Sequence, residues 1–332
     1  MKAKDELLRL VDRIGGLRVL VYGDFVLDEF FYGEIERISR EAPVFIVSHQ
    51  RSDFRPGCAA NAVANLAALG ALPVPCGVLG DDDGADRLDG LFDAMGVSAA
   101  GLVRVPGART PLKTRVVAGG AHSIKQQIVR LDRLSGTADG AGADREVRRL
   151  LEERLPECDA VIVSDYHIGG LLPETGAWLV SRALDAGKPA LADSRHRLPS
   201  YAGATATTPN QPEVEECLGV RIESDDDLRR AGRELLGTLL GKALLITRGG
   251  EGMALFRPGA EPLLIPAFGE EEVVDITGAG DTVIAVFSLA VTAGADFELA
   301  AELANVAGGL TVLKKGASTV SPAELRAALG GA

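Results

Sequence analysis

Short apolar runs alternate with longer amphipathic stretches along most of the chain. The apolar runs predict buried strands over residues 18–23, 74–79, 160–164, 190–193, 204–208 and 243–247. Apolar residues at helical spacing predict helices over residues 59–69, 85–95, 144–155, 173–186 and 225–240. Alternating strands and helices are typical of a parallel sheet covered by helices on both faces, so we predict an α/β fold. Ligands of such sheets bind beyond the carboxyl ends of the strands, which is where catalytic residues are expected.

Two segments of the N-terminal half break this alternation. Residues 28–49 and 110–130 are rich in Val, Ile, Phe and Thr with charges between them, which is typical of amphipathic strands. We predict that they form a small β-sheet that projects from the main sheet as a lid. Two ordinary hairpins at the edge of the core are the alternative. Because no linker or internal repeat divides the chain, we expect residues 1–332 to form one domain that carries this lid.

The composition is that of a globular protein and limits the classes of partner. Hydrophobic residues make up 46% of the 332 residues, which is enough for a core. The chain has 35 Lys and Arg against 47 Asp and Glu, and this net charge of −12 disfavours a protein that coats nucleic acid or a membrane surface. Its four cysteines lack the spacing of a metal site or a disulfide framework. We therefore expect a cytoplasmic protein with reduced thiols that binds neither nucleic acid nor membrane.

The sharpest local signal lies between residues 274 and 282, just before a helix predicted over 283–293. Its small residues Thr277, Gly278, Ala279 and Gly280 favour a tight turn whose backbone N–H groups converge at a helix N-terminus. That geometry binds anions and can stabilise the charge that develops on a phosphoryl group during transfer. Asp281 follows at once and could act as the general base toward a hydroxyl nucleophile.

Two other interpretations of this segment remain open. Gly278 and Gly280 could be half of a dinucleotide-binding fingerprint, but Val283 stands where the third glycine is needed. Alternatively, the segment is a glycine-rich helix start that Asp281 caps, which would be structural only.

A second constellation is the Asn210-Gln-Pro-Glu213 stretch, which follows a predicted strand and opens a helix. An amide and a carboxylate three residues apart could handle Mg²⁺ and phosphate, largely through water, as Mg²⁺ prefers. The alternative is an Asn cap with a Glu in the first turn of the helix, which is common.

A third constellation lies near the N-terminus. Asp28 comes shortly after the first strand, and Gly57 and Asn61 lead into an Ala-rich helix. A carboxylate and an amide beside a glycine turn suit the neighbouring hydroxyl groups of a sugar, although ordinary turn and cap chemistry uses the same residues.

In their order along the chain, with Gly57 and Asn61 early, Asn210 and Glu213 midway and Asp281 late, the three constellations resemble the ribokinase-like (PfkB) family of sugar kinases over nearly the whole chain. The resemblance implies a three-layer α/β/α fold and ATP-dependent phosphate transfer to a sugar hydroxyl, with Mg²⁺. The implied catalytic residues are Asp281 as base and Gly278, Ala279 and Gly280 as the anion hole. The implied sugar-site residues are Asp28, Gly57, Asn61 and Asp165. The implied nucleotide-site residues are Asn210, Glu213, Thr247, Gly249, Gly252, Thr277 and Asn305, of which Asn210 and Glu213 hold the Mg²⁺ through water.

Within that family the chain is most similar to the members that phosphorylate O1 of heptose 7-phosphate during lipopolysaccharide precursor synthesis. The stretch Ile38-Ser-Arg-Glu-Ala-Pro-Val44 is one of several that carry this likeness. It implies that Lys113, Arg115 and Arg130 line an anionic sugar phosphate, although solvated basic side chains are the alternative for each. Some of these members carry a nucleotidyltransferase half, which we expect to be absent here.

The chain departs from the family pattern at three places. Cys58 replaces a glycine, His167-Ile168 replaces Gly-Lys, and Ser194-Arg195 follows Asp193 in place of Pro-Lys. These departures keep open an acceptor such as ribose, fructose or a nucleoside. A sugar- or nucleotide-binding protein without catalysis is the rival from another class. The resemblance further implies a homodimer that pairs through the lid.

Overall fold

The computed structural model describes residues 2–120, 124–134, 140–269 and 273–330. Within these residues the larger sheet has nine strands in the order β13-β12-β11-β10-β9-β8-β1-β4-β5. Its strands are β1 (Arg18–Gly23), β4 (Leu72–Gly80), β5 (Leu102–Val105), β8 (Ala160–Asp165), β9 (Ala190–Ser194), β10 (Ala206–Thr207), β11 (Ala243–Thr247), β12 (Met253–Phe256) and β13 (Leu263–Ile265). Every neighbouring pair from β5 to β11 is parallel, and β12 and β13 are added antiparallel. The predicted α/β fold with a mostly parallel sheet is confirmed.

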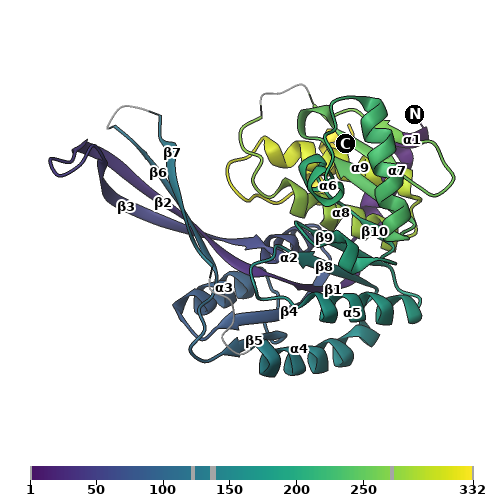
Figure 1. The fold of residues 1–332 in the computed structure, drawn as a ribbon, viewed down its shortest axis with the longest axis horizontal. Coiled ribbons are helices and arrows are strands. Elements are labelled where there is room, and N and C mark those ends of the chain that lie inside the picture. The colour runs from purple at the N-terminus through teal and green to yellow at the C-terminus, as the bar shows by residue number, and fades with distance from the viewer. Residues whose placement is uncertain (1, 121–123, 135–139, 270–272, 331–332) are drawn as a thin grey trace.

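Ten α-helices are present in the described residues, and they lie on both sides of the sheet (Figure 1). They are α1 (Lys2–Arg13), α2 (Ala59–Ala68), α3 (Asp83–Ala94), α4 (Gly140–Arg154), α5 (Pro173–Asp185), α6 (Gln211–Leu218), α7 (Asp225–Leu239), α8 (Ala279–Thr292), α9 (Phe297–Val312) and α10 (Pro322–Ala328). Short 3₁₀ helices are η1 (Leu155–Glu157), η2 (Leu198–Tyr201) and η3 (Gly249–Glu251). None of these helices combines the length and apolar character that crossing a membrane requires.

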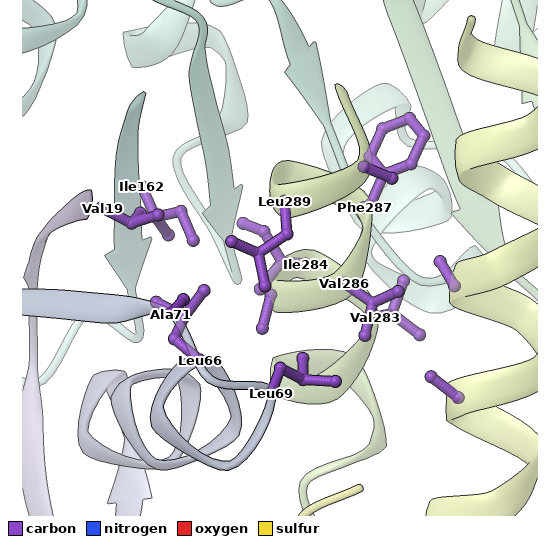
Figure 2. Packing of buried hydrophobic residues seen from close by; sticks show 14 of the residues in the cluster. Val19, Leu66, Leu69, Ala71, Ile162, Val283, Ile284, Val286, Phe287 and Leu289 are labelled. Carbon is purple, nitrogen blue, oxygen red and sulfur yellow. The ribbon is translucent and has the colours of Figure 1, made fainter. Parts of the chain in front are cut away.

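The two faces of the sheet carry separate cores because side chains alternate along each strand. Val19 and Ile162 point to the face that α2, α8 and α9 cover, and Figure 2 shows them beside Leu66 and Leu289 of these helices. Leu20 and its neighbours point to the other face, against α4 and α5. The central strand β8 is buried along its whole length, which is why it reads as a continuous apolar run.

A second, smaller sheet projects from the main body (Figure 1). It has the order β3-β2-β6-β7, from β2 (Phe25–Ile38), β3 (Phe45–Cys58), β6 (Leu112–Gly119) and β7 (Gln126–Arg133). The two predicted lid segments therefore do pair, but the sheet extends further than expected. The glycine turn predicted beside Gly57 lies at the very end of β3, since Pro56 and Gly57 still pair with β2 and α2 begins at Ala59. As the outer strand of this sheet, β3 tolerates a proline that a central strand would not.

The order of the main sheet fixes where a ligand can bind. The chain leaves β1 toward β4 and β5 on one side, whereas β8, β9, β10 and β11 follow on the other side. This reversal is a topological switch point, at which parallel α/β sheets open a crevice beyond the strand ends. The residues after β1 and β8, together with the start of β2, lie at this point.

Candidate active site

The N-terminus of α8 lies at the centre of the candidate site. Gly278 caps the helix in the left-handed conformation (φ 82°, ψ 4°). A Cβ atom at this position would lie 2.4 Å from Nδ2 of Asn61, so glycine is required for space as well as for backbone conformation. Asp275 fixes the turn before the helix, because its carboxylate accepts hydrogen bonds from the backbone N–H groups of Thr277 (2.9 Å) and Gly316 (2.8 Å). The N–H of Ala279 donates to the carbonyl of Ile276 at 3.3 Å, whereas the next N–H groups in the first turn of α8 have no carbonyl partner within the helix and can face an anion.

Asp281, in the first turn of α8, is 4% exposed and is held by two neutral donors. Nδ2 of Asn61 donates to its Oδ2 at 2.7 Å, and the hydroxyl of Tyr166 donates to its Oδ1 at 2.7 Å. Burial raises the pKa of Asp281 to about 6, and the two hydrogen bonds oppose this rise. A carboxylate with such a pKa is ionised at neutral pH and still basic enough to take a proton from a bound hydroxyl group.

Asn61 belongs to a buried polar network that joins α2 to α8. Nδ2 of Asn65 donates to the carbonyl of Asn61 (2.9 Å), and Oδ1 of Asn65 accepts a bond from the hydroxyl of Thr282 (2.9 Å). Both asparagines lie on the buried face of α2. The sequence predicted Asn61 as a sugar ligand, and the structure shows that its amide contacts the carboxylate of Asp281.

One face of the small sheet brings basic side chains to this site. Oδ1 of Asp28 lies 3.0 Å from a guanidinium nitrogen of Arg115, and both side chains are at least 90% buried. Lys113 pairs with Asp28 in the register of β2 and β6, so the two share this face. Burial raises the pKa of Asp28, and the charges of Arg115 and Lys113 oppose that rise. Gly57 is required here because a Cβ atom would lie 2.8 Å from the Asp28 carboxyl carbon.

Cys58 occupies the position at which the sequence departs from the family pattern. It precedes α2 with φ 53°, a backbone conformation that residues with a side chain rarely adopt. Its Sγ accepts a hydrogen bond from Nζ of Lys113 at 3.1 Å, and the lysine is 9% exposed. The thiol therefore occupies space beside the candidate site that glycine would leave open.

Two further predicted sugar-site residues have partners within the protein. Arg130 pairs with Arg115 in the register of β6 and β7, so it lies on the same face, but its guanidinium group forms two 2.9 Å bonds with Asp132. The Asp165 carboxylate is fully buried and is bound by Ser194, Arg197 and Tyr201. Burial alone would raise the pKa of Asp165, but the bonds from Arg197 and Tyr201 hold it below its usual range. The carboxylate of Asp165, the last residue of β8, is thus bonded to protein groups from β9 and the segment that follows it.

The predicted metal ligands form a capping box at the start of α6. Oδ1 of Asn210 accepts from the Glu213 N–H (2.9 Å), and Oε2 of Glu213 accepts from the Asn210 N–H (2.8 Å). This is the cap that the sequence left open as an alternative. Burial and the charges of Glu213, Asp281 and Asp165 raise the pKa of Asp193 well above its usual range. These acidic groups would be stabilised by a cation, although in the described part of the chain no three side chains of metal-binding type could hold one by themselves. The set fits an ion such as Mg²⁺, which keeps much of its coordination to water and phosphate oxygens.

The remaining predicted nucleotide-site residues lie near the end of β11 and on α9. Thr247 ends β11 and forms an isolated bridge with Asn210. Gly249 and Gly252 both have positive φ around η3, and a Cβ atom on Gly252 would lie 2.1 Å from the carbonyl oxygen of Ile265. Asn305 is buried in α9, and its amide donates to the backbone of the β13–α8 connection at Pro266 (2.8 Å).

Tyr166 and Asp193 lie at this site, although the sequence marked them only as residues at strand ends and assigned them no role. The available signal was position alone, since each follows or ends a buried parallel strand. No spacing rule relates residue 166 to residue 281, because only the arrangement of β8 and α8 brings them together.

Comparison with known proteins gives one consistent family. The sequence profile of the pfkB family carbohydrate kinases matches residues 19–324. Proteins named bifunctional protein HldE from Desulfatibacillum aliphaticivorans and Geobacter sulfurreducens are each 41% identical over 320 and 317 residues, which is 96% and 95% of this chain. The aligned part covers 64% of the length of each of these relatives.

Solved structures with the same fold are more distant in sequence. Phosphofructokinase-2 from Escherichia coli in complex with potassium aligns with a TM-score of 0.75 at 18% identity, over 95% of this chain and 98% of that one. A ribokinase from Arabidopsis thaliana complexed with ribose and ATP aligns with a TM-score of 0.73 at 20% identity, over 96% of this chain and 100% of that one. The ribokinase-like fold predicted from the motifs is therefore confirmed.

Proposed function

The chain belongs to the pfkB family of carbohydrate kinases, and from this premise we propose that it transfers the γ-phosphoryl group of ATP to a hydroxyl group of a sugar phosphate. The observation that carries the proposal is Asp281, a buried carboxylate at the N-terminus of α8 whose two oxygens are oriented by Asn61 and Tyr166. Family membership supplies the reaction class, and this geometry supplies a base beside an anion-binding helix end.

In the proposed reaction, Asp281 takes the proton from the acceptor hydroxyl group as that oxygen attacks the γ-phosphorus. The new O–P bond forms while the bond from the γ-phosphorus to the β,γ-bridging oxygen breaks, and ADP leaves with that oxygen. The N–H groups of Gly278, Ala279 and Gly280 would stabilise the negative charge on the transferring group. The small sheet would act as a lid that excludes water from the reacting phosphoryl group.

When bound, Mg²⁺ would neutralise charge on the ATP phosphates, and Asn210, Glu213 and Asp193 are the residues placed to hold it, largely through water. Thr247, Gly249, Gly252, Thr277 and Asn305 are the proposed surroundings of the nucleotide.

The acceptor that we propose is heptose 7-phosphate, phosphorylated at O1. The motif likeness over residues 38–44 and 113–115 supports this choice. Lys113 is the best-placed ligand for the substrate phosphate, because it is a buried cation whose hydrogen-bond partner is the thiol of Cys58 and not a carboxylate. Arg115 is less available, since Asp28 already pairs with it.

We also infer that two copies of the chain pair through the lid. Val129 and Leu131 of β7 are 44% and 53% exposed, and by register they share a face with Val116 and Phe31. This face lies opposite the one that carries Asp28 and the basic residues. Exposed apolar side chains gathered on one face of a sheet favour burial against a partner.

An ADP-release assay with a panel of sugars and sugar phosphates tests the proposed activity. We expect turnover with a sugar phosphate and its loss by at least about a hundredfold in Asp281→Asn, with the Kd for ATP unchanged by calorimetry. Turnover with ribose, fructose or a nucleoside only would replace the acceptor and keep the kinase. ADP release by Asp281→Asn at near the normal rate, or tight sugar binding without any ADP release by the unaltered protein, would overturn the proposal.

A further inference from the structure

Tyr166 contacts Asp281 from a different element than Asn61 does. Asn61 comes from α2, whereas Tyr166 follows the last residue of β8. Its hydroxyl group donates to Oδ1, and the Asn61 amide donates to Oδ2, each at 2.7 Å. With one donor on each oxygen, the carboxylate plane is fixed relative to both helix α8 and the sheet.

The turn that carries Tyr166 is itself held by a buried carboxylate. Oδ2 of Asp24, the residue after β1, accepts the backbone N–H groups of Tyr166 (2.9 Å) and Ile168 (3.2 Å). Oδ1 of Asp24 accepts the N–H of Gly170 at 3.0 Å. The phenol ring packs against a small apolar cluster that contains Val26 and Ile168. The hydroxyl group is therefore presented to Asp281 by a braced turn and not by a free loop.

On the basis of the proposed function, we propose that Tyr166 is a positioning residue of the phosphoryl transfer, which orients the Asp281 carboxylate and keeps it ionised at neutral pH. A hydrogen bond to a buried charged group stabilises the charged form more than the neutral form. Without the phenol hydroxyl, Oδ1 of Asp281 would be buried without this donor, so the carboxylate would hold its proton to higher pH. The general base would also be free to rotate away from the acceptor.

Four other ionisable groups act on this pair, and the tyrosine variant leaves all of them in place. Asp28 from the small sheet raises the pKa of Asp281, and Lys113 from the same sheet lowers it. The Cys58 thiol and the Asp193 carboxyl group act on Tyr166 from β3 and β9. A change in titration on removing the phenol hydroxyl is therefore the effect of that hydrogen bond.

Tyr166→Phe tests the proposal, with Tyr201→Phe as the matched control. Tyr201 is also buried and also donates a 2.7 Å bond to a carboxylate, but that carboxylate is Asp165. In Tyr166→Phe we expect the acid limb of kcat/KM to move to higher pH by about one unit and the plateau to fall at least about tenfold. In Tyr201→Phe the thermal stability falls and the acid limb stays where it is.

Two further measurements separate this proposal from the proposed function and from a folding defect. A ¹³C NMR titration of labelled aspartate, assigned with Asp281→Asn, follows the Asp281 carboxyl group without any turnover. Its pKa rises in Tyr166→Phe if the proposal holds, even if no acceptor sugar is ever found. If Tyr166→Phe does not fold, 3-fluorotyrosine at position 166 supplies a stronger donor of nearly the same size, and the titration then moves to lower pH. An unchanged Asp281 titration in either protein overturns the proposal.

Discussion

Replacing Gly278 with alanine should disable the candidate base without removing any of its donors. Gly278 has φ 82°, and its Cα faces the side chain of Asn61. A Cβ atom there would lie 2.4 Å from Nδ2 of Asn61, against 3.4 Å for an ordinary contact. The amide must therefore move by about 1 Å, since packed side chains leave little other room.

The substitution is expected to lower both the folding stability and the catalytic rate, for separate reasons. An alanine in the left-handed conformation costs about 1–2 kcal/mol of folding stability. The shift of Asn61 breaks its 2.7 Å bond to Asp281, and a displacement of this size in a catalytic group can cost about a hundredfold in rate. We therefore expect kcat to fall about a hundredfold, with the KM for ATP changed much less, because the first-turn N–H groups of α8 remain.

Gly219→Ala is the control for the stability cost of placing alanine in the left-handed conformation. Gly219 ends α6 with φ 66°, and no atom lies within 4 Å of its added Cβ. Steady-state ADP release measures the effect of each variant on the catalytic rate, and thermal melting measures its effect on stability. Both should show this backbone cost, Gly278→Ala should lose further stability because the Asn61 amide is displaced, and only Gly278→Ala should lose turnover. A Gly278→Ala enzyme within about threefold of the normal kcat would refute this account of Asn61 and the base.

Three further predictions concern charge and assembly. Since the pKa of Asp281 is raised to about 6, its ionised form, which is the active one, is lost as the pH falls through 6. In a quenched assay, kcat/KM should therefore drop about tenfold between pH 7 and pH 5. A flat pH profile would contradict the assignment of Asp281 as the base. Arg115→Ala leaves the buried carboxylate of Asp28 without its partner and should lower the free energy of unfolding in urea by about 3–5 kcal/mol. Arg130→Ala removes an exposed ion pair and should lower it by less than about 1 kcal/mol. Equal losses would be evidence against a buried pair. Leu131→Glu should give a monomer by light scattering if the lid pairs two copies, and an unchanged dimer would place the interface elsewhere.

The strands and helices that the sequence predicted best are those with a strong burial pattern. Residues 160–164 lie in β8, which is buried on both sides, and so its apolar run could not belong to a surface element. The antiparallel strands β12 and β13 were missed because they are short. Helix α9 was missed because most of its residues are buried around the whole helix, which removes the amphipathic period. The length of β3 was not foreseen, because its Pro56 and Gly57 suggest a turn, whereas both residues also occur in an outer strand.

The candidate site was predictable in its chemistry and not in its contacts. Asp281 and the glycines before it were singled out because a small-residue turn at a helix start suits an anion, although the same pattern also fits a structural helix cap. Asn61 and Asn210 were assigned to ligands, yet both make structural bonds, because amides serve caps and networks as readily as substrates. The only signal for Tyr166 was its position directly after a buried strand. Its contact with Asp281 depends on how β8 and α8 lie in the fold, which no sequence spacing encodes.

The way in which Asp281 is held explains how the proposed base would work in such an acidic chain. A guanidinium or ammonium group in direct contact would lower the pKa of a buried carboxylate by one to three units and make it a poor proton acceptor. The two groups in contact with Asp281 are instead neutral, an amide and a phenol, so burial prevails and the pKa rises to about 6. The nearby cations have other partners, since Arg115 pairs with Asp28 and Lys113 with Cys58. In the proposed reaction, basicity and anion binding would thus belong to different side chains, which is what a transfer between a hydroxyl group and a phosphoryl group requires.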